Sequence, residues 1–578
     1  MAACAVLHPF VCSVHTTNQL SPLLQVKERM GQQYPTARCH ARLGCGPVAS
    51  VFVLTLHFHR VGASNGIAFG LPPHRILHCG TALAPKMRIF SQAWRHKHAR
   101  VKLTPPAWIT LEIPRSPRQF QSMAGASDVT YPTTADIVII GGGLAGMAAA
   151  LEAIDANAAL RVVLLEKEPK VGGNSAKASS GINAAQSKDD LDAYLQDTLK
   201  SGGGFTNPVL AHTLVHQSLD GIRFLESKGV DLSVQCQLGG HSTERTRRNK
   251  TGPNVGFAIT SALKKAIDAA ASQIQVVTNA KVTKLVASGT NAVSGVEYRV
   301  DGADYAVSTP AVILATGGYS ANTALLKSLA PGMESFATTN GPWATGDGLE
   351  LATALGAALV DTDKVQLHPT GFIDPKDRHK STRYLAPEAL RGAGGILLNV
   401  QGHRFVNELA TRKEVSNAML AQPEKRSFLV LLQTDQVQAA CQALGLGFYE
   451  KIGLVKVVPT LEGLADVMGV PPTVLDVEFD TYLKGARGET KDAFGRTAFA
   501  NVTELRPMYV LEVEPVVHYC MGGVQINEHA EVLLGTHNVA TGLFAAGEVS
   551  GGLHGGNRLG GNSLTECVLR KELPLARY

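Results

Sequence analysis

The sequence lacks the cysteine patterns that hold common metal centres. Its nine cysteines include no pair separated by two residues and no Cys-x-x-Cys-His segment, so iron–sulfur clusters, structural zinc and c-type haem have no basis in the sequence. No metal site is therefore expected. The cysteines of the main body are widely scattered, which favours packing residues in a reducing compartment over a disulfide framework. They are Cys236, Cys441, Cys520 and Cys567.

Long hydrophobic runs are also missing. The longest apolar stretches, around Val48–Leu56 and Gly66–Leu71, fall short of the roughly 20 residues that a membrane-spanning helix needs, so no membrane span is expected. Charged residues make up only 18% of the 578 residues, whereas 45% are hydrophobic and 58 are glycine. This composition is typical of an enzyme with a large core and many tight turns, and the length allows two or more domains.

Acidic residues are nearly absent from the first 127 residues. This leader has 14 Lys and Arg but only Glu28 and Glu112 as acids, a charge of +12, which leaves −6 for the rest of a chain with a net charge of +6. The main body therefore has no basic excess that would predict nucleic-acid binding. A basic, acid-poor leader is typical of organellar transit segments, although its arginines do not fall on one amphipathic face. We expect residues 1–127 to be a disordered or targeting segment of a mitochondrial or cytoplasmic protein, unless translation begins at Met123.

After residue 128 the sequence predicts a βαβ unit. A short apolar strand at Ala135–Ile140 is followed by a small-residue helix at Leu144–Ala156 and a second strand at Arg161–Glu166. The motif Gly141-x-Gly143-x-x-Gly146 opens the helix, and Glu166 follows at about the 20-residue spacing of a dinucleotide-binding fingerprint. The glycines allow a tight turn and close approach to a pyrophosphate. The helix N-terminus offers free N–H groups to the phosphates, and the Glu166 carboxylate can accept hydrogen bonds from a ribose.

Further polar loops favour FAD over the shorter NAD. A second loop, Asn174–Asn183, is rich in small and hydroxyl residues, and Asp347 lies in the glycine-rich segment Ala344–Gly348. Glu548 follows an apolar strand at Leu543–Ala546, where an acid can bind the ribityl hydroxyls. Ser563 lies at the start of a last helix, whose N-terminus would stabilise negative charge at the N1–C2=O edge of reduced flavin.

The remaining pattern predicts a two-part α/β fold. Helices are expected around Asp189–Lys200 and Leu210–Lys228, two strands within Gln275–Val300 and a buried strand at Ala311–Ala315. Residues 370–510 look like a separate lobe, whose strands are interrupted by turn-rich stretches such as Lys484–Arg496. We therefore expect a Rossmann-like FAD-binding domain, 128–369 and 511–578, with an inserted α+β capping domain, 370–510, that clamps the substrate.

Five further motifs carry a resemblance to a known family. In chain order they are Gln366-Leu-His-Pro-Thr370, Glu388-Ala-Leu-Arg-Gly392, Asn407-Glu-Leu-Ala-Thr-Arg412, His518-Tyr-Cys-Met-Gly-Gly523 and His554-Gly-Gly-Asn-Arg558-Leu-Gly-Gly-Asn562. With the glycine motif, they make nearly all of 134–568 similar to the soluble fumarate reductase flavoproteins, within the wider family of succinate dehydrogenase and fumarate reductase flavoprotein subunits. The resemblance implies an oxidoreductase that converts fumarate to succinate by hydride transfer from reduced flavin N5.

The resemblance also implies how the cofactor is held and reduced. The membrane-bound members attach FAD covalently through a His in the loop after the first βαβ unit, but here that loop, Ser175–Gly181, contains no His. Noncovalent FAD is therefore expected, and a separate electron donor, either reduced flavin or a reductase. The expected FAD contacts are Gly141, Gly143, Ala145, Gly146, Glu166, Asn174, Ser175, Ser179, Ser180, Val282, Asp347, Tyr519, Glu548, Ser563 and Leu564.

The substrate site is likewise implied by the matching motifs. His368, His518 and Arg558 would hold the two carboxylates of fumarate, Arg558 in a two-pronged manner. Arg412 would be the acid, which is chemically unusual because the pKa of arginine is above about 12, and Glu388 and Arg391 would form the relay that re-protonates it. If that relay segment is helical, its two members share a face. The resemblance adds Ser180, Gly560 and Gly561 to the substrate contacts.

Two departures from the family keep alternatives open. The residue before Glu388 is Pro387, where the family often has a threonine hydroxyl that helps to bind substrate, and a proline offers neither a hydroxyl nor an N–H. Pro574 would end the last helix early, which could weaken flavin binding. A reductase of another α,β-unsaturated acid such as urocanate or an acrylate, an L-aspartate oxidase, and a non-catalytic flavin-binding subunit therefore remain as alternatives.

Overall fold

The computed structural model describes residues 130–499, 502, 504–535 and 538–569, and two strands of the leader, β1 (Val11–Thr16) and β2 (Phe52–His57). The two leader strands pair antiparallel. Contacts along the chain separate Met1–Met123 from Ala124–Tyr578. The other expectations for the leader, and the effect of Pro574, lie outside the described residues.

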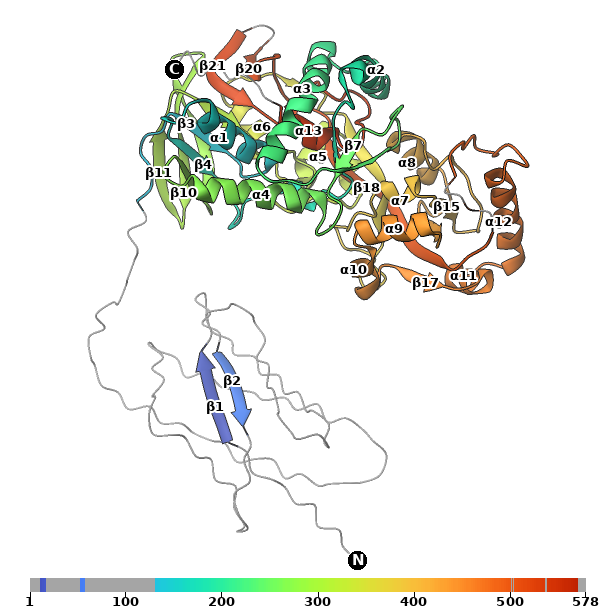
Figure 1. The fold of residues 1–578 in the computed structure, drawn as a ribbon. Helices are drawn as coiled ribbons and strands as arrows, with labels where there is room; N and C mark the ends of the chain where they lie inside the picture. Colours follow the sequence, from blue (N-terminus) through green and yellow to red (C-terminus); the bar gives the residue numbers. More distant parts are fainter. Residues whose placement is uncertain are drawn as a thin grey trace, which may run out of the picture. The chain divides into compact units, whose positions relative to one another are not determined.

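A nine-stranded sheet organises the larger unit (Figure 1). Its order is β11-β10-β21-β12-β3-β4-β8, with β20 beside β21 and β9 beside β10. The strands β21, β12, β3, β4 and β8 run parallel, whereas β9, β10 and β11 form an antiparallel meander. Their bounds are β3 Ile137–Ile140, β4 Val162–Leu165, β8 Ile274–Val277, β9 Lys281–Ser288, β10 Ala292–Val300, β11 Ala303–Ser308, β12 Val312–Leu314, β20 Glu531–Leu534 and β21 Asn538–Ala545.

The parallel strands are uninterrupted apolar runs because both faces of the sheet are buried. Along β3, Ile137 and Ile139 belong to one hydrophobic cluster, while Val138 and Ile140 belong to another on the opposite face. Successive side chains of a strand point to opposite faces, so four apolar residues in a row supply both cores. The helices of this part are α1 Leu144–Ala156, α2 Leu191–Gly202, α3 Pro208–Ser227, α4 Val255–Ala269, α5 Thr323–Leu329, α6 Asp347–Thr353 and α13 Asn562–Glu566.

A five-stranded antiparallel sheet forms a second lobe, drawn at the right of Figure 1. Its order is β14-β18-β16-β15, with β17 also paired to β18. Alternate residues of its strands face two hydrophobic clusters, which helices from the same lobe cover. The elements are β14 Val365–Phe372, β15 Ile396–Asn399, β16 Ser427–Leu432, β17 Lys456–Val458, β18 Met508–Cys520, α7 Ala389–Gly392, α8 Arg412–Leu420, α9 Asp435–Ala443, α10 Leu446–Lys451, α11 Leu461–Met468 and α12 Pro472–Ala486.

Two small three-stranded sheets complete the described elements. One has the order β5-β7-β6 and the other β13-β19-β22. Their bounds are β5 Ile182–Asn183, β6 Val234–Cys236, β7 Thr246–Arg248, β13 Leu359–Val360, β19 Gly523–Gln525 and β22 Ser550–Gly551. The limits proposed at 369/370 and 510/511 fall inside β14 and β18, so the chain passes between the two lobes along continuous strands.

Most of the predicted elements are present. The helix at Leu144–Ala156 and the Rossmann-like α/β fold are confirmed. The expectation of two strands within Gln275–Val300 was wrong: β8 ends at Val277, and a left-handed turn at Asn279 (φ 55°) sends the chain into β9, which pairs with β10 rather than with β4. The expected turn-rich stretch Lys484–Arg496 overlaps the end of α12, which continues to Ala486. The polar residues there had suggested a loop rather than the last turn of a helix.

The four cysteines of the main body pack against the hydrophobic clusters, as predicted. In the part of the chain that the structure describes, no helix has both the length and the apolar character needed to cross a bilayer. Within the same residues, His, Cys, Asp and Glu side chains do not gather into a group of three or more that could hold a metal ion.

Gly146 is predicted to be essential to the packing of α1 on the glycine turn. A Cβ there would lie 1.9 Å from the carbonyl oxygen of Gly141. Gly146→Ala should therefore lower the free energy of unfolding by about 1–3 kcal/mol, as overpacking does, measured by denaturant titration of the purified protein. Gly447→Ala in α10 is the control, because its added Cβ meets no atom within 4 Å. Equal stability of the two variants would contradict the packing argument.

Candidate functional site

One cavity of about 850 Å³ runs from the glycine turn to the second lobe. Gly141 and Glu166 lie at one end of its wall, and Arg412 and His518 at the other. The apolar part of its wall exceeds the polar part. A large, mainly apolar cavity with a few polar groups is the usual form of a cofactor site, so this cavity is the candidate site.

The three glycines of the turn have different physical roles. Gly141 has φ +107°, and a Cβ there would lie 2.4 Å from the carbonyl oxygen of Ala315. Gly146 packs against Gly141, as described above. At Gly143 an added Cβ would meet only Ser175 Oγ, at 3.8 Å, and the residue lines the cavity. Two glycines therefore shape the turn, and the third leaves the cavity open at the start of α1.

Glu166 ends β4 and closes the same end of the cavity. Its Oε2 accepts from the backbone N–H of Gly142 at 2.7 Å, and its Oε1 from that of Glu168 at 2.8 Å. Burial raises the pKa of this carboxyl, although the two backbone donors oppose that effect. A carboxylate oxygen can accept more than one hydrogen bond, so Glu166 still has capacity for ligand hydroxyls.

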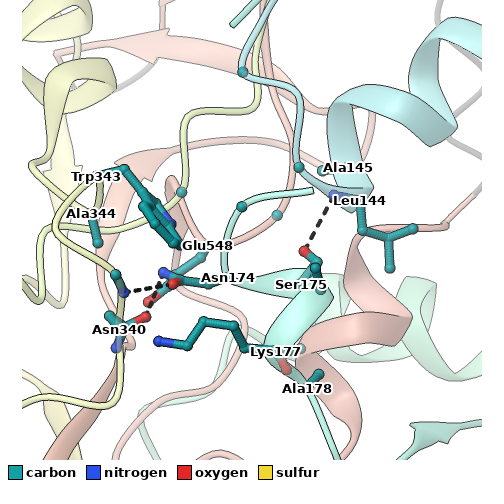
Figure 2. Close-up of a pocket in the computed structure, with 18 of the residues that line it drawn as sticks. Leu144, Ala145, Asn174, Ser175, Lys177, Ala178, Asn340, Trp343, Ala344 and Glu548 are labelled. Carbon is teal, nitrogen blue, oxygen red and sulfur yellow. Dashed lines mark hydrogen bonds between the residues drawn. The ribbon is translucent and has the colours of Figure 1, made fainter. Parts of the chain in front are cut away.

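The second loop closes over the cavity beside α1 (Figure 2). Ser175 Oγ accepts from the backbone N–H of Leu144 at 3.2 Å, at the start of the helix. Asn174 reaches a segment far away in sequence: its Nδ2 donates to Asn340 Oδ1 at 2.6 Å, and its Oδ1 accepts from the backbone N–H of Gly341 at 2.9 Å. The beginning of the loop is thereby fixed both to α1 and to the segment at Asn340.

Two acids mark other parts of the cavity wall. Asp347 Oδ2 accepts from Lys167 Nζ at 2.6 Å. Glu548 is deeper, and its Oε1 accepts from the backbone N–H of Cys520 at 2.9 Å. Burial raises the pKa of Glu548 to about 7, so this carboxyl can be protonated, and can donate a hydrogen bond, near neutral pH.

Several buried polar atoms of the wall have no partner within the protein. They are Ser179 Oγ, Thr316 Oγ1 and Trp343 Nε1. Buried polar groups are nearly always hydrogen-bonded, so these atoms fit a ligand with polar groups along its length. With the open approach at Gly143 and the acceptor at Glu166, the wall suits a dinucleotide with a large ring system, and FAD fits that description.

At the far end lie the two imidazoles and the arginine that are predicted to clamp the substrate. The rings of His368, on β14, and His518, on β18, lie with their centroids 5.0 Å apart. Arg558 is 2% exposed, its Cζ lies 4.3 Å from the ring centroid of Tyr519, and its NH1 donates to the carbonyl of Leu559 at 3.0 Å. Burial, reinforced by the charge of Arg412, holds the pKa of both imidazoles well below its usual value, so both rings are neutral.

Arg412 lies beside the clamp at the first residue of α8. Its Nε donates to Glu388 Oε2 at 2.7 Å, and its NH1 donates to Gln366 Oε1 at 3.0 Å. Glu388 also faces Arg391, whose NH2 lies 3.6 Å from Glu388 Oε1. Burial would raise the pKa of Glu388, but the charges of Arg412 and Arg391 outweigh it and lower the pKa to about 2. The three residues predicted to form the relay are therefore neighbouring buried charges. Glu388 directly precedes α7 and faces Arg391, three residues later in that helix.

Glycines give these charges room. A Cβ at Gly560 would lie 2.9 Å from both Arg412 NH2 and Glu388 Oε2, and one at Gly561 would lie 2.1 Å from Asn183 Oδ1. Pro387 precedes Glu388 as the sequence showed, and its carbonyl accepts from the N–H of Leu390 at 3.0 Å. Pro387 thus bonds to the first turn of α7 through its carbonyl but provides no side-chain donor.

The cavity wall contains most of the residues predicted for the site. They are Gly141, Gly143, Ala145, Glu166, Asn174, Ser175, Ser179, Ser180, Val282, Asp347, Arg412, His518, Tyr519, Glu548, Arg558, Gly561, Ser563 and Leu564. Five others lie behind the wall. Gly146, His368, Glu388 and Gly560 are next to residues that line it, and Arg391 is paired with Glu388. Their individual roles stay predictions.

Sequence reasoning missed several polar residues of the wall. Lys177, Thr339, Asn340 and Trp343 line the cavity, and three of them belong to the segment that precedes Ala344–Gly348. That position, directly before a predicted glycine-rich loop, was the signal that could have found them.

Gly143→Ala is predicted to separate cofactor binding from folding. The added methyl group meets no close protein atom, so the apoprotein should unfold at the same denaturant concentration as the unchanged protein. The methyl group narrows the cavity at the start of α1, and we expect FAD to bind about tenfold more weakly, roughly 1.4 kcal/mol. Flavin absorbance per protein after gel filtration measures this, and full flavin retention would contradict the assignment.

Comparisons with known proteins agree with this geometry. The family described as FAD binding domain matches residues 136–564. The fumarate reductase of Schizosaccharomyces pombe is 39% identical over 454 residues, which is 75% of this chain and 87% of the relative. Fumarate reductase 1 of Saccharomyces cerevisiae is 40% identical over 463 residues, 75% of this chain and 96% of the relative.

A solved structure shows the same fold. The open conformation of a flavocytochrome c3 fumarate reductase superposes with a TM-score of 0.63 at 33% identity, covering 77% of this chain and 79% of that one. The chain therefore belongs to the FAD binding domain family and is an FAD-dependent oxidoreductase related to the fumarate reductases.

Proposed function

We propose that this chain is a fumarate reductase, which adds two electrons and two protons to fumarate and forms succinate. The observation that carries the proposal is the clamp at the end of the FAD cavity, where Arg558 and two neutral imidazoles lie beside the Arg412–Glu388 pair. Both yeast relatives described above are named as fumarate reductases. A dicarboxylate needs cationic and hydrogen-bonding groups at both ends, and the clamp offers them.

FAD is proposed to bind without a covalent link. The loop Ser175–Gly181 has no histidine or cysteine side chain, so the position where the membrane-bound members attach flavin has no attacking group. Gly143 and Ser175 would lie against the pyrophosphate, Glu166 against a ribose, and Glu548 against the ribityl chain. Bound FAD, once reduced, supplies two electrons and one hydrogen to the first alkene carbon.

The imidazoles would act as neutral hydrogen-bond donors. Nδ1 of His368 accepts from the backbone N–H of Thr370 at 3.2 Å, so the hydrogen of this neutral ring is on Nε2. That Nε2–H is buried and has no partner within the protein. On His518, Nδ1 is engaged with Thr339 Oγ1 at 2.7 Å. Two oriented rings therefore complement the charge of Arg558 and bind carboxylate oxygens without adding charge.

Arg412 is proposed to protonate the second alkene carbon. Its Nε and NH1 are bound to Glu388 and Gln366, and the glycine at 560 leaves space beside its NH2. The pKa of Glu388 is low because Arg412 and Arg391 are charged. When Arg412 gives up its proton, one of these charges disappears and the pKa of Glu388 rises, which favours uptake of a proton by Glu388 and its return to Arg412.

The remaining parts of the proposal concern the electron donor and the compartment. Reduced flavin or a separate reductase is proposed as the electron donor. A basic, acid-poor leader supports a mitochondrial location, and a cytoplasmic one is the alternative. Sequencing the N-terminus of the mature protein distinguishes them, because a transit segment is removed.

Replacement of Arg412 tests the proton donor. Arg412→Ala should slow fumarate-dependent reoxidation of the bound flavin by about 10²–10⁴-fold, the usual contribution of a positioned acid, while the flavin absorbance stays unchanged. Lys413→Ala is the matched control, since Lys413 is the next residue of α8 and is exposed. Turnover by Arg412→Ala at the control rate would rule out this donor.

A substrate panel tests the identity of the acid. Fumarate should reoxidise the reduced enzyme faster than acrylate or urocanate, which lack its pair of carboxylates on the alkene. Arg558→Met should raise KM for fumarate by about tenfold or more, because a charged hydrogen bond contributes about 1.5–3 kcal/mol. Faster reoxidation by acrylate or urocanate would replace the proposal with a reductase of that acid. Reoxidation by none of these acids would support a non-catalytic flavin-binding subunit.

A further inference from the structure

Lys177 is a cavity residue that the proposed mechanism does not use. It lies in the second loop, at the end of the short 3₁₀ turn Ser175–Lys177, and its side chain extends across the cavity toward Asn340 (Figure 2). Its Nζ donates to the carbonyl oxygen of Thr339 at 2.5 Å and lies 5.9 Å from the ring centroid of Trp343. Among the described residues no carboxylate forms an ion pair with it.

The contacts of Thr339 locate Lys177 along the cavity. The carbonyl of Thr339 accepts from Lys177, and its hydroxyl is bonded to His518 Nδ1 at 2.7 Å. A single residue, Thr339, thus connects Lys177 to His518 of the proposed substrate clamp, whereas Glu166 and the glycine turn lie at the nucleotide end. Since the flavin ring must meet the substrate at the clamp, Lys177 lies at the ring end of the bound cofactor.

Two acids at this end of the cavity have partners other than Lys177. Glu388 is neutralised by Arg412 and Arg391. Glu548 is bonded to the backbone N–H of Cys520, and burial raises its pKa to about 7. Lys177 lines the cavity with its side chain exposed, and its partial burial lowers its pKa. An anion placed in the ring end of the cavity would be attracted to this ammonium group.

We propose that Lys177 stabilises the reduced, negatively charged form of the bound flavin, and so sets the reduction potential of the cofactor. Two-electron reduction puts extra negative charge on the N1–C2=O edge of the flavin, and nearby protein charge tunes it. The N-terminus of α13 was expected to serve this purpose, but α13 has only five residues, so few peptide dipoles add up there. The inference requires bound FAD and does not depend on which acid the enzyme reduces.

Three substitutions separate charge from structure. Lys177→Arg keeps the charge, Lys177→Gln keeps a donor that can reach the carbonyl of Thr339 without the charge, and Lys177→Met removes both. Lys170→Met is the matched control, because Lys170 also lines the cavity but follows Glu166 toward the nucleotide end. All four are measured as FAD-loaded protein without substrate.

Two readouts report the charge near the flavin. The first is redox titration against a reference dye. The second is titration with sulfite, whose lone pair forms a bond to N5 of oxidised flavin and leaves negative charge on the ring. For Lys177→Gln and Lys177→Met, we expect sulfite to bind at least tenfold more weakly. The preference for reduced flavin should fall about tenfold, a potential about 30 mV lower. Lys177→Arg and Lys170→Met should match the unchanged protein.

The outcomes distinguish this inference from its competitors. A potential and a sulfite affinity in Lys177→Gln equal to those of the unchanged protein would overturn the inference, and a change confined to Lys177→Met would assign Lys177 a structural tie to Thr339. If Lys177→Met loses FAD, the potentials and sulfite affinities of Lys177→Gln and Lys177→Arg still show whether the charge matters. Failure of the protein to reduce fumarate would leave these measurements intact, so the two proposals can fail separately.

Discussion

The antiparallel pairing of β14 with β18 is the contact on which the geometry of the site depends. In this register His368 is opposite Val516, and a bulge on either side of the pair shifts the partners of the flanking residues. Bulges re-aim side chains at such positions, and here the two imidazole rings come to lie 5.0 Å apart. Beyond His518 the same strand reaches Cys520, whose N–H is bonded to Glu548 in the FAD cavity. One strand therefore carries His518, which is predicted to bind substrate, and residues in contact with the FAD cavity.

Three arginines of the site form a buried cluster of like charges. Arg391, Arg412 and Arg558 repel one another, and burial lowers the pKa of Arg391 and of Arg558. Uncompensated buried charges cost several kcal/mol each. Glu388 offsets part of this cost by facing two of the arginines. The charges of Glu408 and Glu548 also favour the charged forms of Arg391 and Arg558. An anionic ligand would offset more of this cost, which agrees with the carboxylate binding proposed for the site.

Local features of the site were predictable, and contacts between distant segments were not. The bounds of α1 and the positions of Gly141 and Gly146 follow from short-range rules, because a tight turn before a buried helix needs glycine. The bond from Asn174 to Asn340 and the bond from Lys177 to Thr339 join loops that are about 160 residues apart. Nothing in the pattern of either loop specifies the other. The division of Gln275–Val300 into three strands was missed because of the turn at Asn279. Asparagine tolerates the left-handed conformation found there, but no glycine or proline marks the turn in the sequence.

The segment Thr338–Gly341 joins the two halves of the chemistry. On one side Asn340 and Gly341 hold Asn174, and Thr339 holds Lys177. On the other side Thr339 bonds the ring of His518, and Asn340 Nδ2 donates to the His518 carbonyl at 2.9 Å. Thr338–Gly341 therefore positions both the Asn174–Asn183 loop beside the cofactor site and the ring of His518, which is proposed to bind the substrate. The proposed reaction requires the flavin ring and the alkene to meet within a few tenths of an ångström of their productive geometry. Because Thr338–Gly341 contacts both the cofactor loop and His518, it can keep the distance between flavin and alkene constant.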